Sequence, residues 1–318
     1  MALSHQFVRG LQDAVNDNFD LLPSELRRMA APVVPLRRPS LEVDLPTLAT
    51  KLEPETGILW ARMKHQDRAC YTPSLVGDSR SYQIYLQEQC GHLSADEMPF
   101  RYLVWTSEAK GAFSLGGDLA FFTECVRSGN ERALRDYAQR CIDVLHDNYN
   151  ALGLPVLTVA LVTGDAIGGG LESMITNDIV VAERGAKFGL PEILFNLFPG
   201  MGGYSYLVRK VGERAARAFI EDGKSRSAEE MLELGLVDVL AEPGQGEAAL
   251  REHLGSHGSR FNMLRTIRRA CKRVDPVQKT ELLDIVNIWV DLAMQLGADD
   301  LRRMDCLARV QEKKRVRT

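Results

Sequence analysis

The chain has 318 residues, 45% of them hydrophobic and 26% charged, so it can bury a full core as one large domain or two small ones. Its net charge of −4 gives no reason to expect nucleic-acid binding. The six cysteines are scattered without a CxxC pair, and no apolar run suits a signal peptide or a membrane span. We therefore expect a cytoplasmic protein with reduced thiols and no membrane insertion.

Residues 1–40 are predicted to form an N-terminal arm and linker. Phe7, Leu11, Val15 and Phe19 recur at helical spacing, which favours a short amphipathic helix. Several prolines follow and indicate an extended linker. We expect the arm to pack on a neighbouring surface or subunit, with partner binding as the alternative.

Residues 41–245 alternate short apolar runs with amphipathic stretches. The predicted strands are 56–63, 101–106, 156–162, 178–182, 187–190 and 236–240. The predicted helices are 74–89 with Ser74 as N-cap, 130–152, one that begins at Gly169, 204–211, and one that begins at Ala228 after the capping box Ser227-Ala-Glu-Glu230 and ends at Gly235. Residues 107–118 and 198–203 are predicted loops. Because every periodic segment in 246–318 is helical, we predict an α/β core followed by a C-terminal helical cap.

The middle of the chain carries the pattern on which the functional prediction rests. A buried strand leads into three glycines, Gly168 to Gly170, that open a helix. Free backbone N–H groups and the positive end of a helix dipole therefore meet at one point. Glu172 falls in the first turn of this helix, and Glu192 follows twenty positions later after a Gly-Leu-Pro turn. Backbone donors beside two carboxylates outline an acid/base catalytic site.

Three linked motifs resemble the enoyl-CoA hydratase/isomerase, or crotonase, superfamily. They are Phe113-Ser-Leu-Gly-Gly-Asp118, Gly164-Asp-Ala-Ile-Gly-Gly-Gly-Leu-Glu172 and Phe188-Gly-Leu-Pro-Glu192, and the similarity covers roughly residues 55–245. The resemblance implies an α/β fold built as a crotonase-type spiral of ββα units in residues 41–245. It also implies that residues 246–318 form a helical cap and oligomerisation region and that the assembly is a trimer or hexamer. We expect no cofactor.

Within the superfamily, the chain is most similar to synthases of diffusible signal factor, a cis-2-unsaturated fatty-acid messenger. The long N-terminal lead, Cys70-Tyr-Thr-Pro73, Ser114-Leu-Gly-Gly-Asp118 and the ending 302–310 carry this similarity. It implies dehydration of a 3-hydroxyacyl thioester, on acyl carrier protein or CoA, to a cis-2-enoyl thioester, followed by hydrolysis to the free acid. Two alternatives stay open: a conventional enoyl-CoA hydratase or isomerase that leaves the thioester intact, and a non-catalytic protein that binds a sensor kinase or another regulator.

The resemblance also implies roles position by position. The N–H groups of Gly117 and Gly169 would hold the oxygen of a thioester enolate, and Glu172 and Glu192 would move protons. The alternatives without catalysis are a helix-stabilising carboxylate at Glu172 and an exposed loop residue at Glu192. The predicted substrate-binding residues are Leu115, Gly116, Gly168, Leu194, Phe195, Pro199, Gly200, Met201 and Trp289, with core packing as the alternative for the apolar ones.

Other conspicuous polar residues are assigned no catalytic role. Asp118 is expected to hold the loop beside it through side-chain to backbone hydrogen bonds. His253 and His257 are four apart, but Gly255 and Gly258 argue against a helix there, and no third metal ligand is evident. No GxGxxG motif follows a strand and no P-loop lysine is present, so we expect neither a metal nor a nucleotide cofactor.

An apolar stripe near the C-terminus would be costly to leave exposed. It consists of Leu282, Ile285, Val286, Trp289, Leu292, Ala293 and Leu296. The family resemblance implies that this region packs across a subunit boundary and closes over the acyl chain. The alternative is that it packs on the chain's own core.

Overall fold

The computed structural model describes residues 40–65 and 68–313. Contacts divide the chain into two units, residues 1–39 and residues 40–318. All of the described helices and strands belong to the second unit. The helix predicted from Phe7 to Phe19 lies outside the described residues. Among the described residues, no helix has both the length and the apolar character needed to cross a membrane.

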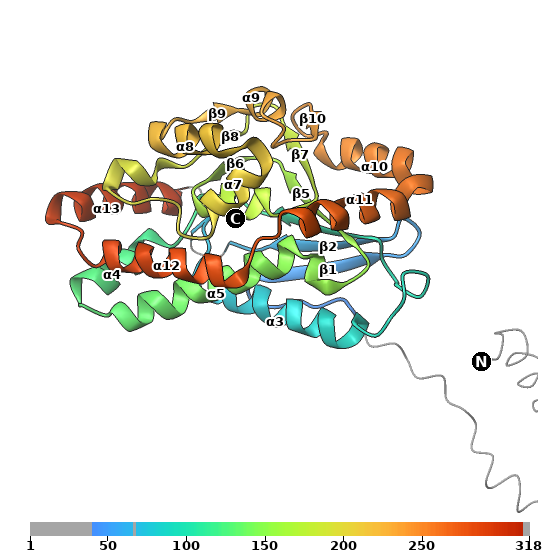
Figure 1. Ribbon diagram of the computed structural model, residues 1–318, viewed down its shortest axis with the longest axis horizontal. Coiled ribbons are helices and arrows are strands. Elements are labelled where there is room, and N and C mark those ends of the chain that lie inside the picture. The colour runs from blue at the N-terminus through green and yellow to red at the C-terminus, as the bar shows by residue number, and fades with distance from the viewer. Residues whose placement is uncertain (1–39, 66–67, 314–318) are drawn as a thin grey trace, which may run out of the picture. The chain divides into compact units, whose positions relative to one another are not determined.

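A six-stranded sheet runs through the middle of the fold (Figure 1). Its strands, in spatial order, are β1 (Leu48–Glu53), β2 (Ile58–Met63), β3 (Tyr102–Ser107), β5 (Leu157–Val162), β7 (Ile179–Glu183) and β10 (Val239–Ala241). β1 is antiparallel to β2, and all the other neighbours are parallel. Every residue of β5 is buried, which agrees with a parallel strand covered on both faces and explains why the sequence there is almost entirely apolar.

A second, smaller sheet delivers the loops that matter for function. Its strands are β4 (Ala112–Ser114), β6 (Asp165–Ile167), β8 (Lys187–Gly189) and β9 (Arg226–Ser227) in that order. β4, β6 and β8 are parallel, and β9 is antiparallel to β8. Each of the three parallel strands directly follows a strand of the large sheet and precedes a helical segment. This repeat confirms the spiral of ββα units that the resemblance implies.

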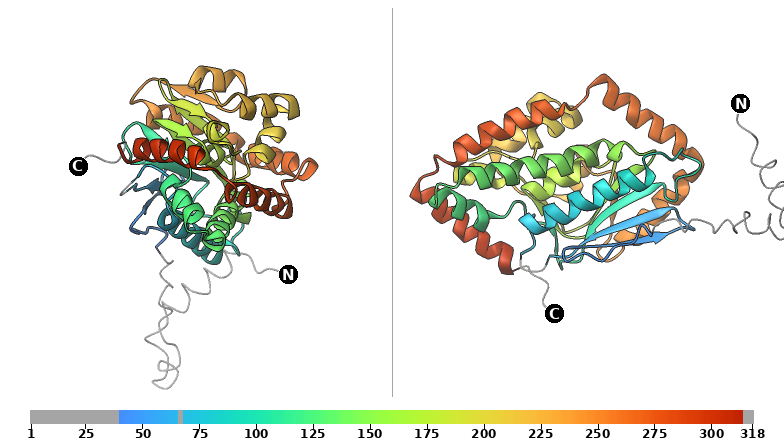
Figure 2. Two further views of the ribbon diagram at one scale, coloured as in Figure 1. Left: turned by 90° about the vertical axis from the view of Figure 1, so that its left-hand side faces the viewer. Right: turned by 90° about the horizontal axis from the view of Figure 1, so that it is seen from below.

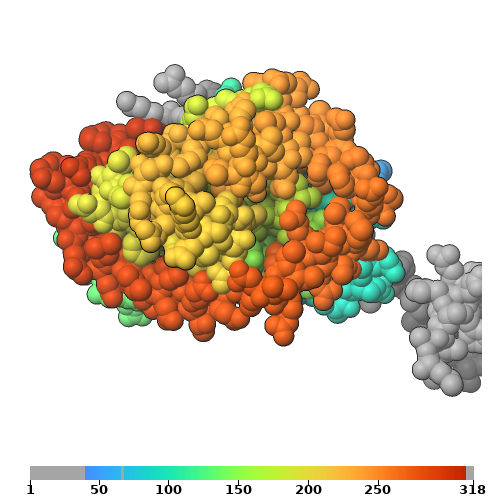
Figure 3. All heavy atoms as spheres, turned by 45° about the horizontal axis from the view of Figure 1, so that its top comes forward, coloured from blue at the N-terminus to red at the C-terminus, as the bar shows by residue number. Residues whose placement is uncertain are grey.

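Helices surround the two sheets (Figures 1 and 2). They are α3 (Pro73–Cys90), α4 (Leu119–Arg127), α5 (Glu131–Tyr149), α6 (Gly169–Ile175), α7 (Gly203–Val211), α8 (Glu213–Asp222), α9 (Ala228–Glu233), α10 (Gly246–His257), α11 (Phe261–Val274), α12 (Lys279–Ala293) and α13 (Ala298–Lys313), with short 3-10 turns η2 (Ala151–Gly153), η3 (Pro191–Phe195) and η4 (Gly258–Arg260). α5 lies between α3 and α12, and α13 packs beside α4. On the face shown in Figure 3, the C-terminal segments in orange and red border the yellow segment that contains α7.

The apolar stripe of α12 packs on the chain's own α5. Leu282, Val286, Trp289 and Ala293 are buried. Trp289 also packs edge to face on Phe122 of α4, with ring centroids 5.3 Å apart. These buried residues agree with the alternative prediction, in which the stripe packs on the chain's own core. Packing of this region across a subunit boundary stays a prediction.

Capping residues explain where two of the helices begin. α3 starts at Pro73, and its N-cap is Thr72 rather than the predicted Ser74, because proline suits the first turn and Thr72 Oγ1 accepts from Leu75 N at 3.2 Å. The predicted capping box of Ser227 and Glu230 is confirmed, and α9 begins at the expected residue.

Several local predictions were wrong or incomplete. α10 runs through Gly255, so the argument against a helix at His253 and His257 fails; their rings stack within it at 4.4 Å between centroids. A single glycine lowers helix stability by only about 1 kcal/mol, which tertiary packing overrides. The elements β1, α4, α8, β9, β4 and β6 were not predicted from the sequence. The last two have three residues each, too few to show an alternating pattern.

Candidate active site

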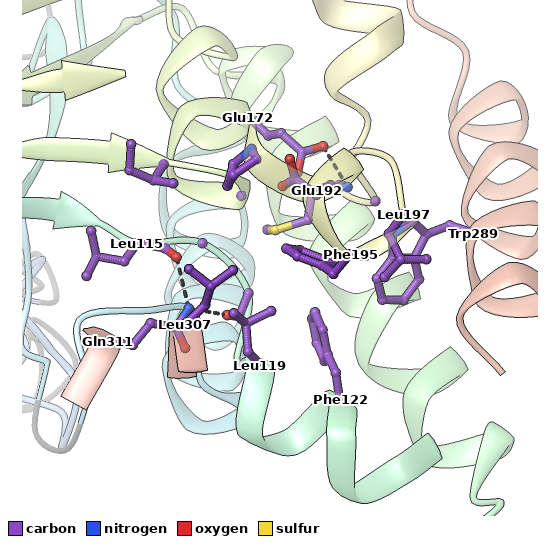
Figure 4. A pocket seen from close by; sticks show the side chains of 18 of the residues that line it. Leu115, Leu119, Phe122, Glu172, Glu192, Phe195, Leu197, Trp289, Leu307 and Gln311 are labelled. Carbon is purple, nitrogen blue, oxygen red and sulfur yellow. Dashed lines mark hydrogen bonds between the residues drawn. The ribbon is translucent and has the colours of Figure 1, made fainter. Parts of the chain in front are cut away.

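A cavity of about 200 Å³ lies among α4, α6, η3, α12 and α13 (Figure 4). The carboxyl ends of β4, β6 and β8 are neighbours in the small sheet, and the segments that follow them meet at this cavity. Figure 4 shows the side chains of Glu172 and Glu192 close together at one side of it, away from the ring of Phe122. The cavity therefore has a polar side and a largely apolar body, an arrangement that suits an acyl chain with a reactive head.

Glu172 is held by the loop that precedes α7. It lies in the first turn of α6 and is 1% exposed. Its Oε1 accepts hydrogen bonds from Met201 N and Gly203 N, both at 2.7 Å. Burial raises the pKa of this carboxyl, against the opposing effect of the two backbone donors. The glycine at position 203 is needed because a Cβ there would lie 2.9 Å from Glu172 Oε1.

Glu192 faces the cavity from the first turn of η3. Its Oε2 is buried and makes no hydrogen bond within the part of the chain that the structure describes. Burial raises the pKa of Glu192, and the nearby charge of Glu172 raises it further. Gly168 adopts a φ of +55°, and a Cβ on it would meet Glu192 Oε1 at 2.7 Å, so both backbone and space call for glycine here.

Two backbone N–H groups lie side by side at the cavity wall. They belong to Gly117, in the loop after β4, and Gly169, the first residue of α6. Gly117 N lies 3.3 Å from the place that a Cβ on Gly169 would take. Neither N–H donates to another protein atom among residues 40–65 and 68–313. Two adjacent free donors are the requirement for binding an oxyanion.

Asp118 has the structural role that the sequence analysis expected. Its Oδ1 accepts from Phe121 N at 3.1 Å and so caps α4. Its other carboxylate oxygen pairs with Arg68 at 3.2 Å. Asp118 is 1% exposed, and it does not line the cavity.

The sequence profile of the enoyl-CoA hydratase/isomerase family matches residues 92–253, just over half of the chain. The chain belongs to this family. The matched residues include β4, β6 and β8 and all of the loops that carry the two glutamates and the two free N–H groups.

Two curated relatives match somewhat less than half of the chain. The chain is 38% identical over 141 residues to the fatty acid oxidation complex subunit alpha of Idiomarina loihiensis, which covers 44% of this chain and 19% of that protein. It is 34% identical over 153 residues to the subunit of the same name from Pseudomonas savastanoi pv. phaseolicola, which covers 46% of this chain and 20% of that one. The chain thus spans about a fifth of the length of these curated relatives.

Several solved structures share the fold. An enoyl-CoA hydratase from Bacillus halodurans superposes with a TM-score of 0.67 at 20% identity, covering 82% of this chain and 99% of that one. DspI of Pseudomonas aeruginosa superposes with a TM-score of 0.59 at 24% identity, covering 84% of this chain and 98% of that one. At these identities the likeness concerns the fold.

Most residues predicted to bind substrate line the cavity. They are Leu115, Gly116, Gly168, Phe195, Gly200, Met201 and Trp289. Leu194 does not: it is 53% exposed on the outside of η3, where its carbonyl accepts from Arg303 at 3.1 Å. Pro199 is buried but packs against Gly203 rather than on the cavity. Leu194 and Phe195 are consecutive in a 3-10 turn, so their side chains point in different directions and only one can face inward.

Several residues of the cavity wall were not predicted. Leu119 and Phe122 belong to α4, and Leu307, Val310 and Gln311 belong to α13. The apolar positions of α13 give no signal by themselves because core packing produces the same helical spacing. The residues of α13 lie beside residues almost 200 positions earlier in the sequence because this last helix packs on α4.

Glu192→Gln is expected to increase the free energy of unfolding at neutral pH. Folding raises the pKa of Glu192 above its usual value of 4.5, so the folded protein keeps this proton to higher pH than the unfolded chain. Stability therefore falls as pH rises above 4.5, by about 1.4 kcal/mol for each unit of the pKa rise, until the folded pKa is passed. Glutamine keeps the volume and removes this cost.

Urea unfolding of parent and Glu192→Gln at neutral and at acidic pH measures this difference. In acid, Glu192 is protonated in both the folded and the unfolded state, so the two proteins should become equally stable. A stability difference that is the same at both pH values would contradict the raised pKa.

Proposed function

We propose that the protein removes and adds water across C2 and C3 of an acyl thioester. The observation that carries the proposal is that the carboxyl groups of Glu172 and Glu192, both with raised pKa values, lie beside the free N–H groups of Gly117 and Gly169. Family membership supports enoyl-CoA hydratase/isomerase-type chemistry. The apolar body of the cavity offers a place for the acyl chain.

Dehydration requires two proton transfers at one site. One glutamate, as carboxylate, takes a proton from C2 of a 3-hydroxyacyl thioester, and the electron pair passes through a thioester enolate to form the C2–C3 double bond. The C3 hydroxyl leaves as water with the proton of the other glutamate. Gly117 N–H and Gly169 N–H hold the enolate oxygen. Raised pKa values suit this reaction because one carboxyl must be ionised while the other stays protonated.

The finer proposal is that the product is a cis-2-enoic acid released from its carrier. It rests on the sequence similarity to diffusible signal factor synthases. After dehydration, water attacks the thioester C1, the same two N–H groups hold the oxygen of the tetrahedral intermediate, and the thiol of the carrier leaves. Acyl carrier protein as the carrier, assembly as a trimer or hexamer, and a sensor kinase as a partner belong to this finer proposal.

A conventional enoyl-CoA hydratase is the second candidate. The curated relatives are named as subunits of a fatty acid oxidation complex, and this observation favours a CoA thioester as substrate. In that reaction the two glutamates add water to a 2-enoyl thioester and the thioester bond survives. The two candidates therefore differ in whether C1 leaves the enzyme as an acid or as a thioester.

Product analysis by mass spectrometry separates the candidates. Parent protein is incubated with 3-hydroxyacyl thioesters of CoA and of acyl carrier protein, with Glu172→Ala and Glu192→Ala as matched inactive controls. A free cis-2-enoic acid that both variants fail to make supports the finer proposal. A product still attached to its carrier supports the hydratase instead, and a folded parent without turnover on either carrier contradicts both.

A further inference from the structure

Three successive carbonyl groups of the loop before α4 are hydrogen-bonded by residues from two other segments. Nε2 of Gln311, on α13, donates to Leu115 O at 2.9 Å and to Gly117 O at 2.8 Å. The backbone N–H of Tyr71 donates to Gly116 O at 2.8 Å. Because two carbonyls can be bonded only by the nitrogen of an amide, this contact also fixes which way the Gln311 amide is turned. Gln311 is 2% exposed, so water does not compete for these bonds.

These bonds set the direction of the Gly117 N–H. The peptide unit between Gly116 and Gly117 is planar and trans, so its C=O and N–H point to opposite sides. With Gly116 O held by Tyr71, the N–H of Gly117 must point away from Tyr71. The Gly117 nitrogen then lies beside Gly169, 3.3 Å from the place of a Cβ on that residue.

Tyr71 is also bonded to the helix that carries the second donor. Its buried phenol hydroxyl forms a hydrogen bond with Ser173 Oγ of α6, the helix that begins at Gly169. Tyr137 OH donates to the carbonyl of Tyr71 at 2.6 Å and holds this residue in place. Through its backbone and its side chain, Tyr71 therefore connects the Gly117 loop to α6 and limits how far the two N–H groups can separate.

We propose that Gln311 and Tyr71 are positioning residues for the thioester oxygen. Gln311 fixes the loop of the first donor, and Tyr71 fixes that loop relative to the helix of the second. This inference rests on the proposed function and assigns two residues to it that do not touch the reacting atoms. Since Leu307 and Val310 of α13 line the cavity, the last helix both covers the acyl chain and completes the donor geometry.

The test compares steady-state kinetics of Gln311→Met and Tyr71→Phe with those of the parent. Methionine has nearly the length of glutamine but no N–H donor, and phenylalanine removes only the bond to Ser173. Misplacing a donor should lower kcat while KM changes little, because negative charge develops on the oxygen on the way to the enolate and is absent from the bound substrate. We expect kcat to fall about 10- to 100-fold in Gln311→Met and less in Tyr71→Phe.

Arg127→Ala is the matched control. Arg127 of α4 pairs with Asp305 of α13 at 2.6 Å, so its loss weakens the docking of the same helix without touching the Gly117 loop. Its kcat should stay near that of the parent. Amide hydrogen exchange of residues 115–117 provides a readout if Gln311→Met is poorly active, and exchange should accelerate in that variant but not in the control.

The results distinguish the positioning role from helix docking and from the proposed function itself. An active parent with unchanged kcat and unchanged loop exchange in Gln311→Met and Tyr71→Phe would overturn the positioning role and leave the proposed function standing. An equal loss in Arg127→Ala would assign the effect to helix docking and likewise overturn it. A folded parent without thioester turnover would instead contradict the proposed function on which the inference rests.

Discussion

Replacing Glu172 or Glu192 by glutamine is expected to lower kcat by about 10²- to 10⁴-fold, the usual contribution of a positioned acid or base. Glutamine keeps the volume of the side chain, and at position 172 its oxygen can still accept from Met201 N and Gly203 N. The loop that closes on Glu172 should therefore keep its shape. KM should change little because proton transfer is lost while the binding surface stays the same.

The double variant gives the sharper result. Loss and addition of water need both proton transfers, so removing the second glutamate after the first should cost little more. Glu183→Gln is the matched control, since Glu183 is also a buried glutamate whose Oε1 accepts a backbone N–H, from Gly246 at 2.9 Å, but it lies outside the cavity. If the factors by which the single variants lower kcat multiply in the double variant, the two glutamates do not act as a unit. A comparable loss of kcat in Glu183→Gln would show that the effect is not specific to the pair.

The convergence of the two glutamates could not be derived from their spacing in the sequence. They meet because β6 and β8 are parallel neighbours, and each strand ends a few residues before its glutamate. The strand at 187–190 was predicted from the sequence but β6 was not, so the residues alone did not place both carboxyls at one sheet edge. The family resemblance supplied that arrangement, and the strand pairing now gives its physical cause.

Long elements were more predictable than the contacts between them. The apolar run 156–162 matches β5 to within one residue, since a strand buried on both faces leaves an unbroken apolar signature. The roles of Gln311 and Tyr71 had no comparable signal. Gln311 contacts the loop of Gly117 across 194 positions. Tyr71 contacts that loop through its backbone N–H, which carries no sequence information, and it bonds to Ser173 through a hydroxyl 102 positions away in the sequence.

Side-chain direction in short turns was another limit. Leu194 and Phe195 are both apolar and adjacent, so composition alone predicts the same environment for both. The 3-10 turn separates them and sends Leu194 to the surface beside α13. Trp289 shows the opposite case, because its place on the stripe of a long helix was enough to predict an inward side chain, which the structure puts on the cavity wall.

Gly169→Ala is expected to lower kcat by about 10²- to 10³-fold, the typical cost of losing one oxyanion donor. The added methyl group would lie 3.3 Å from Gly117 N, in the space where the thioester oxygen must sit between the two donors. Loss of the helix cannot explain such an effect, because alanine is a better helix former than glycine by about 1 kcal/mol. The φ of Gly169 is also outside the left-handed region, so alanine fits the backbone.

The new methyl group also has a second contact, and the effect of that contact on kcat must be distinguished from blocking of the oxyanion site. The methyl would also press against Met201 Sδ, the flexible end of a side chain that lines the cavity. Met201→Ala alone and combined with Gly169→Ala provide the comparison, with kcat and KM measured for each. If the methyl group blocks the oxyanion site, removing the sulfur leaves kcat of the double variant as low as that of Gly169→Ala. Recovery of kcat would instead assign the loss to the clash with Met201. It would contradict the expectation that a methyl group at position 169 occupies the place of the thioester oxygen.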